Sequence, residues 1–210
     1  MKTSKGYWKN PIKWSEANDW MECVKCGWRG EWFKVIEDTP NLDWQILTKR
    51  PENIFSLGTD AVGEVWDLWL ARQKNVWLGA SVENQDYFEP RVKALIQNGI
   101  QAQVLFLSVE PMLGPVRLTP VPMSAAATWW QFTPGEKTKI DWIICGGESG
   151  DGCRPMDVQW ARDLRDDCKT WGVKFFMKQL GGYPDKCDKL TDLPKDLRIR
   201  ELPTPRIEVG

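Results

Sequence analysis

Short apolar runs recur along the chain, and each is followed by a polar, turn-rich stretch. Five such runs begin at intervals of 27 to 38 residues: Trp44–Leu47, Trp77–Ala80, Val104–Leu107, Trp142–Cys145 and Lys174–Met177. Runs this short, and nearly apolar throughout, are typical of strands buried on both faces of a parallel sheet. The pattern therefore predicts five parallel strands.

Between the predicted strands, apolar residues recur at the spacing of amphipathic helices. The clearest sets are Val62, Val65, Trp66, Trp69 and Leu70, then Phe88, Val92, Leu95 and Ile96, and finally Trp160, Ala161, Leu164, Cys168 and Trp171. The last helix is expected to begin after Asp157, a favoured N-cap residue, and to end at Gly172. Strand–helix units at this spacing predict an α/β fold with right-handed βαβ connections, either a (β/α) barrel, complete or partial, or a doubly wound open sheet.

The repeat divides the chain into three parts. Residues 1–40 precede it, residues 41–183 contain the five units, and residues 184–210 are expected to form an extended tail rich in proline and charge. Residues 115–139 break the pattern, because four prolines exclude a continuous helix. We interpret them as an insertion, either a lid over a site or surface elaboration.

Aligning the five runs on their first residues brings polar side chains into two registers. Four positions further on stand Thr48, Ser81, Ser108, Gly146 and Lys178, and six positions further on stand Arg50, Glu83, Glu110 and Glu148. Residues two apart on a strand share a face, so these side chains would ring one end of the sheet. That end is the carboxyl end of the strands, where ligands bind in α/β barrels and open sheets.

We therefore expect a ligand site at this end of the sheet. Its predicted residues are Thr48, Lys49, Arg50, Ser81, Glu83, Ser108, Glu110, Gly146, Gly147, Glu148 and Lys178. Three carboxylates close to three cations would perturb one another's pKa values, as functional sites often do. The alternative interpretation is a ring of salt bridges that closes the mouth of a barrel.

Composition narrows the chemistry of such a site. The 210 residues include 28 basic and 29 acidic side chains, which gives a net charge of −1 and no general attraction to nucleic acid. The absence of histidine excludes Ser-His-Asp catalysis and histidine-ligated zinc within this chain. Because the sequence shows no signal peptide and no apolar run long enough to span a membrane, we expect a cytoplasmic protein with reduced thiols.

Two cysteines have the spacing of a metal knuckle. Cys23 and Cys26 resemble half of a zinc ribbon, in which paired thiolates hold one side of a tetrahedral zinc. A structural site needs four ligands, and further thiolates could come from Cys153, Cys168 and Cys187 if the fold brings them close. Cys145 lies in a predicted strand and is expected in the core.

Seven segments, in order, carry a resemblance to a known family. They are Tyr7–Trp14, Thr39–Pro51, Asn75–Gln85, Leu107–Pro115, Asp141–Gly150, Arg154–Met156 and Phe175–Gln179. Together they resemble a phage-associated family named after gene products 37 and 68. Its members look like radical-SAM-type barrels, so the resemblance implies a partial, TIM-like (β/α) barrel that binds S-adenosylmethionine.

The same resemblance implies an iron–sulfur cluster, held in the family by an N-terminal three-cysteine motif. The pattern C-x-x-x-C-x-x-C occurs nowhere in this chain, and the family usually has another strand where Cys23 and Cys26 stand here. We therefore expect no cluster from this chain alone. An upstream segment or a partner chain would have to supply the motif.

Two functional hypotheses follow. In the first, the strand ends bind S-adenosylmethionine or a nucleotide-like ligand: the glutamates accept hydrogen bonds from ribose hydroxyls or an amine, and Lys49, Arg50 and Lys178 hold anionic groups. In the second, the barrel is a scaffold for a zinc-knuckle interaction module, which touches nucleic acid through Lys25, Arg29 and exposed tryptophans.

Metal analysis of anaerobically purified protein distinguishes these hypotheses. The knuckle hypothesis predicts stoichiometric zinc that is lost in Cys23→Ser, because a tetrahedral site then lacks a ligand. It also predicts a function that survives changes to the strand-end residues. Iron together with sulfide would contradict both hypotheses, since other cysteines would then hold a cluster.

Overall fold

Five parallel strands form a sheet whose order follows the chain. The computed structural model describes residues 28–56, 65–99, 101–119, 121–122, 129–130, 140–182 and 189–205. The sheet has the order β1-β2-β3-β6-β7, with the bounds Trp44–Thr48, Val76–Ser81, Val104–Val109, Trp142–Gly146 and Lys174–Gln179. All four pairings are parallel, as the apolar runs predict.

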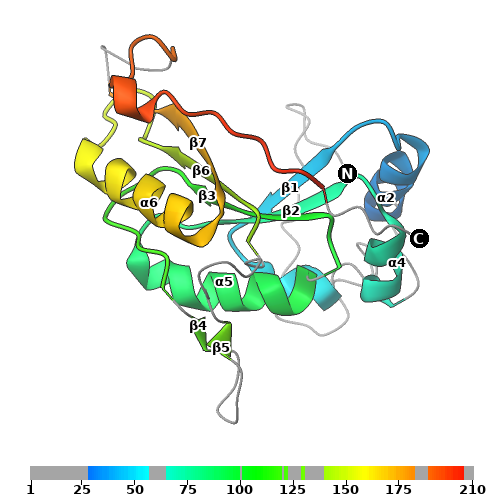
Figure 1. The fold of residues 1–210 in the computed structure, drawn as a ribbon. Coiled ribbons are helices and arrows are strands. Elements are labelled where there is room, and N and C mark those ends of the chain that lie inside the picture. The colour runs from blue at the N-terminus through cyan, green and yellow to red at the C-terminus, as the bar shows by residue number, and fades with distance from the viewer. Residues whose placement is uncertain are drawn as a thin grey trace.

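The helices lie against one face of this sheet. They are α2 (Trp28–Asp38), α4 (Trp66–Arg72), α5 (Gln85–Gly99) and α6 (Val158–Trp171), with short 3-10 turns at Pro51–Asn53 and Lys195–Leu197. Figure 1 shows α5 and α6 on the same side of the strands. Right-handed crossovers in a constant direction produce this arrangement, whereas a doubly wound sheet reverses its strand order and has helices on both faces.

The α/β prediction is therefore confirmed, and the winding is that of a barrel segment. Within the described residues the sheet is open, because β1 and β7 pair with β2 and β6 but not with each other. We call the face that carries the helices the outer face and the opposite one the inner face. In a closed barrel the inner face would line the interior.

Both faces of the sheet are apolar, which explains the continuous apolar runs. On the outer face, Leu78, Leu105 and Ile143 belong to the large core that includes the helices. On the inner face, a smaller cluster consists of strand residues alone: Trp77, Val104, Phe106 and Trp142, with Ile144 and Phe176 packed against them. Every residue of β2 and β3 is buried.

One glycine shapes the inner face. A Cβ atom on Gly79 would stand only 2.4 Å from ring carbons of Phe106, so the phenylalanine ring lies across β2 where a side chain is missing. Gly79 and Phe106 are directly paired in the parallel register. The ring therefore covers two strands of the inner face.

The predicted helices are confirmed where the structure describes them. Asp157 caps α6 by accepting a hydrogen bond from the Gln159 amide, and Gly172 ends it with φ 69°. The four residues of α5 that the periodicity selects are all buried, as is Gly99. Val62 lies outside the described residues, whereas Trp66 and Trp69 are buried on α4.

Helix α2 was not predicted. Its Phe33 packs edge-on against Trp66 and Trp69, with ring centroids 5.8 and 4.8 Å apart. Within Trp20–Phe33, where the resembling family usually has a strand, residues 28–33 are helical, and residues 20–27 lie outside the described part.

The C-terminal segment packs on the sheet. Residues 199–201 run antiparallel to β7: the Met177 amide donates to the Ile199 carbonyl and the Glu201 amide to the Phe175 carbonyl. Leu193 and Leu197 are buried in the large core. Of the segment expected as an extended tail, residues 199–201 thus pair with the free edge of β7, and the residues before them contribute to the core (Figure 1).

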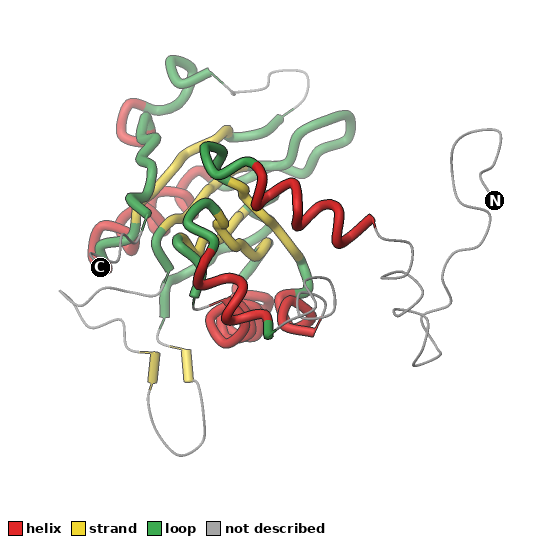
Figure 2. The backbone as a smooth tube through the Cα atoms, turned by 90° about the vertical axis from the view of Figure 1, so that its right-hand side faces the viewer, coloured by secondary structure: helices red, strands yellow, loops and turns green. Residues whose placement is uncertain are grey.

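The first residues of the insertion pack against the core, and the strands that follow lie away from it. Val116 and Leu118 are buried, and Arg117 pairs with Asp167 of α6 at 2.6 Å. Val121–Pro122 and Trp129–Trp130 then pair as the short antiparallel strands β4 and β5, which lie away from the main sheet (Figure 2). None of the helices in the described part is long and apolar enough to cross a membrane.

The Gly79–Phe106 contact yields a stability prediction. Gly79→Ala should lower the free energy of unfolding by about 1–3 kcal/mol, because the new methyl group overlaps the ring. Adding Phe106→Leu should recover part of this loss. Denaturant unfolding of the two single variants and the double variant measures the coupling.

Gly114→Ala is the matched control. Its Cβ would meet the Asn84 side chain at 3.5 Å, an ordinary contact, and the substitution should change the free energy of unfolding by less than about 1 kcal/mol. Equal losses in Gly79→Ala and Gly114→Ala would contradict the packing argument.

Candidate functional site

Charged side chains meet at the carboxyl end of the sheet. Glu83, just after β2, lies 2.8 Å from the Lys49 ammonium and 2.7 Å from the Arg91 guanidinium. Burial alone would raise the pKa of Glu83, but the hydrogen bonds from Lys49 and Arg91 outweigh it and lower this pKa. Glu83 is 6% exposed and both of its oxygens are paired.

Glu110, just after β3, has a different environment. Lys178 approaches both of its oxygens, at 2.9 and 3.0 Å, and the Gln179 amide donates to Oε1 at 3.4 Å. The Lys178 side chain is 53% exposed, so this cation can leave the pair at little cost in packing. Glu110 is thus a half-buried acceptor with an exposed counterion.

Beneath this pair the strands carry small polar residues. Ser81 and Ser108 are direct neighbours in the register, and both are buried. Gly146 permits close approach, because a Cβ there would stand 3.3 Å from the carboxyl carbon of Glu110. The predicted residues Ser108, Gly146, Glu110 and Lys178 therefore do come together.

A groove of about 620 Å³ runs across the inner face to this polar end. Its lining comes from β1, β3, β6, β7 and the C-terminal segment: Gln45, Leu47, Phe106, Ser108, Glu110, Trp142, Ile144, Phe176, Lys178, Gln179 and Arg200. The floor is aromatic and aliphatic, and the polar groups gather where the strands end. Such a combination of an apolar cavity with a few convergent polar groups is typical of small-molecule sites.

Glu148 forms its hydrogen bonds with Arg154, a residue of the same loop. Arg154 binds both carboxylate oxygens, at 2.6 and 2.8 Å, and its backbone amide donates to Oε2 at 2.8 Å. These bonds lower the pKa of Glu148 to about 2. The neighbouring position, 147, requires a glycine, because a Cβ atom there would overlap the carbonyl of Leu180. The loops after β6 and β7 are therefore in close contact at this point.

Of the predicted residues, Ser108, Glu110 and Lys178 line the groove and the other eight do not; Thr48 and Arg50 also take no part in the charge pairs described above. Thr48 pairs with Ala80, whose side chain belongs to the outer-face core, and its hydroxyl accepts a hydrogen bond from the Arg50 amide. Arg50 is exposed, and no ion pair within the described residues joins it to Glu83, Glu110 or Glu148. The alignment of the runs matched Trp44 with Trp77, but in the structure β2 begins at Val76 and Trp44 pairs with that residue. This offset of one position places Thr48 on the face opposite to the one predicted for it.

Several residues of this region were not predicted as part of a site, among them Arg91, Arg154, Gln179 and, from the C-terminal segment, Arg200. Arg91 and Arg154 lie outside the strand registers, on α5 and in the loop after β6, and only the fold brings them to Glu83 and Glu148. Gln179 follows Lys178, so strict alternation assigns it to the outer face. Its nearly complete burial, at 4% exposure, is visible only in the structure.

The described residues hold no group of three side chains suited to a metal ion. Cys145 and Cys168 are buried, and burial raises the pKa of the Cys145 thiol to about 12. The described part therefore does not fit an iron–sulfur cluster. Cys23, Cys26 and Cys187 lie outside it, so zinc at the Cys23/Cys26 pair stays a prediction.

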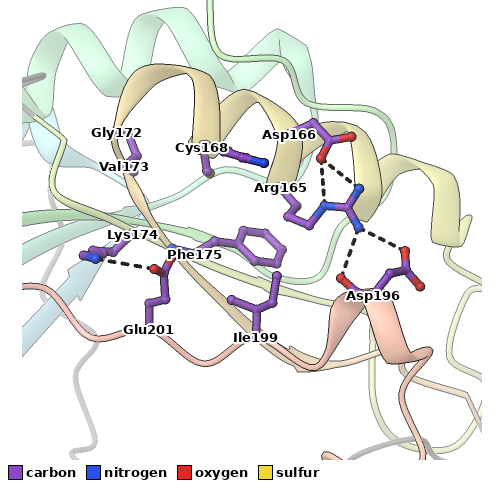
Figure 3. Close-up of a pocket in the computed structure, with 11 residues that line it drawn as sticks. Arg165, Asp166, Cys168, Gly172, Val173, Lys174, Phe175, Asp196, Ile199 and Glu201 are labelled. Carbon is purple, nitrogen blue, oxygen red and sulfur yellow. Dashed lines mark hydrogen bonds and ion pairs between the residues drawn. The ribbon is translucent and has the colours of Figure 1, made fainter. Parts of the chain in front are cut away.

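A second cavity, of about 710 Å³, lies at the amino end of β7 between α6 and the C-terminal segment (Figure 3). Arg165 pairs with Asp166 and Asp196 at its rim, and Lys174 pairs with Glu201. Cys168, Phe175 and Ile199 are among its apolar residues. Because these charges pair with one another, we interpret this cavity as a packing gap between the C-terminal segment and α6 and not as a ligand site.

A parallel sheet wound in one direction, with a groove on the face away from its helices, defines an α/β protein of barrel-like winding. The family model described as "Protein of unknown function (DUF5131)" matches residues 3–202, and the chain belongs to this family. No curated protein and no solved structure matches the chain.

The Glu148–Arg154 clamp yields a pH prediction. Since the pKa of Glu148 is lowered to about 2, its contribution to folding is fully present above the ordinary value of 4.5 and is lost as the pH falls through about 2. Carboxyl-carbon NMR should report a midpoint near 2. In Arg154→Ala this midpoint should return toward 4.5, and an unchanged midpoint would show that Arg154 is not the cause.

Proposed function

We propose that this protein binds S-adenosylmethionine or a nucleotide-like ligand in the groove on the inner face of its sheet. The observation that carries the proposal is the juxtaposition of an apolar, aromatic floor with the Glu110–Lys178 pair at the carboxyl end of the strands. Ligands of α/β barrels and open α/β sheets bind at that end.

The floor suits a planar ring. Trp142 packs against Phe106 and Phe176 with ring centroids 5.8 Å apart in both cases, so the three rings form one aromatic cluster. All three line the groove. A nucleobase placed there would gain dispersion and edge or face contacts of the kind that aromatic pairs make.

The polar end suits the rest of such a ligand. Glu110 can accept hydrogen bonds from hydroxyl or amine groups, and Lys178 can pair with a carboxylate or phosphate. Glu83 and Glu148 are less suited to this role, because Glu83 is held by two cations and Glu148 by both the side chain and the backbone amide of Arg154, whereas Glu110 pairs with one lysine. We assign direct ligand contact to Glu110 and Lys178.

The resemblance to radical-SAM-type barrels supports S-adenosylmethionine as the first ligand to test. In those enzymes a reduced iron–sulfur cluster cleaves the ligand to a carbon radical. The described residues bring no three candidate metal ligands together, so we derive no reaction step and limit the proposal to binding. An upstream segment or partner chain with the three-cysteine motif stays part of the hypothesis.

Calorimetric titration with S-adenosylmethionine tests the proposal. Glu110→Gln and Lys178→Ala should each weaken binding by roughly 10-fold or more, because a hydrogen bond to a charged group contributes about 1.5–3 kcal/mol. Quenching of tryptophan fluorescence is a second readout, since Trp142 lines the groove.

Lys174→Ala is the matched control. Lys174 and Lys178 lie at opposite ends of β7, and both side chains are about half exposed. Like Lys178, Lys174 pairs with a glutamate, but at the amino end of the strand and away from the groove. Its removal should leave the affinity unchanged. Wild-type affinity in both Glu110→Gln and Lys178→Ala would refute the proposed site.

A further inference from the structure

An irregularity in the sheet places one side chain in the groove against the strand pattern. The β6–β7 register runs regularly to Cys145–Met177 and then shifts, so that Gly146 pairs with Gln179 and Lys178 is an extra residue. A bulge of this kind changes the side toward which the next side chain points. Bulges are frequent next to functional sites for that reason.

The side chains of β7 show the effect. Phe175 and Met177 belong to the outer-face core, and regular alternation would send Gln179 to the same side. Instead Gln179 lines the groove together with Lys178, and its amide nitrogen reaches Glu110. Two consecutive residues of one strand thus face the same carboxylate.

The orientation of the Gln179 amide is itself fixed. Its nitrogen donates to the Gly147 carbonyl at 3.0 Å and to Glu110 Oε1 at 3.4 Å. The bond to a backbone carbonyl requires the nitrogen at this position, so the amide can only donate to Glu110. A buried group held by the backbone is a more rigid partner for Glu110 than the half-exposed Lys178.

Gly146 provides the space for this arrangement. A Cβ on Gly146 would stand 3.3 Å from the carboxyl carbon of Glu110 and 3.5 Å from Cγ of Gln179. The glycine therefore lets both side chains close over the end of β6. This packing supports the geometry independently of the hydrogen bonds.

We infer that Gln179 is a positioning residue that holds the Glu110 carboxylate toward the groove, so that the site recognises ligands by hydroxyl groups that donate to Glu110. The inference rests on the proposed function. A carboxylate has about four lone-pair sites, and with Lys178 and Gln179 as its donors Glu110 keeps acceptor capacity for a ligand. Vicinal ribose hydroxyls are donors of the required kind, whereas a 2′,3′-dideoxyribose lacks both of them and keeps only the 5′-hydroxyl.

The test compares the affinities of adenosine and 2′,3′-dideoxyadenosine, measured by calorimetry. Wild-type protein should prefer adenosine by roughly 10-fold or more. Gln179→Met keeps the volume and removes the donor, and it should reduce this preference at least threefold, mainly by weakening adenosine binding. Gly146→Ala should reduce the preference as well, because the added methyl group displaces Glu110.

Gln103→Met is the control variant. Gln103 is a similarly buried glutamine, 6% exposed, at the amino end of β3, and its replacement should leave the preference unchanged. A merely structural role of Gln179 would lower thermal stability and leave the ratio of the two affinities as it is. An unchanged ratio in Gln179→Met, or an equal loss in Gln103→Met, would overturn the inference.

The two proposals can fail separately. If wild-type protein binds both nucleosides with equal affinity, the groove site stands and the role of Gln179 is refuted. If it binds neither these nucleosides nor S-adenosylmethionine, the proposed function fails and the inference fails with it.

Discussion

The inner face of the sheet depends on the contact between Phe106 and Gly79. With no side chain at Gly79, the phenylalanine ring lies across β2, and no residue of β2 lines the groove. The floor therefore continues from Leu47 on β1 to Phe176 on β7. A side chain on β2 at this level would overlap the ring, because protein interiors are close-packed and leave no free space for it.

The ion pairs then distinguish three glutamates that occupy the same position after their strands in the sequence. Glu83 is enclosed by Lys49 and Arg91, and Glu148 is bound by Arg154 through side chain and backbone. Both pairs hold the loops that follow the strands. Within the described residues Glu110 pairs with one lysine, and its second donor, the Gln179 amide, lies 3.4 Å away, so Glu110 can exchange a protein partner for a ligand at the lowest cost.

Much of the fold follows from local pattern. The five apolar runs coincide with the five strands of the parallel sheet, and Asp157 and Gly172 mark the ends of α6 through capping interactions that depend on neighbouring residues. Helix α2 also has helical apolar spacing, with Phe33 and Ile36 buried and Trp32 packed against the core, but it precedes the strand–helix repeat and was not predicted. Its Phe33 packs against Trp66 and Trp69, which lie more than 30 residues away in the sequence and become neighbours only in the folded chain.

The sequence by itself determined the α/β class, the strand positions and the end of the sheet where Glu83, Glu110 and Lys178 gather, because the twofold period of a strand sets which residues share a face. Only the tertiary structure decided which cation each carboxylate binds, since Arg91 and Arg154 come from other elements. It also decided that Thr48 faces the helices and Gln179 the groove. One offset in strand register and one bulge reverse the side on which a residue lies, and neither is visible in the order of amino acids.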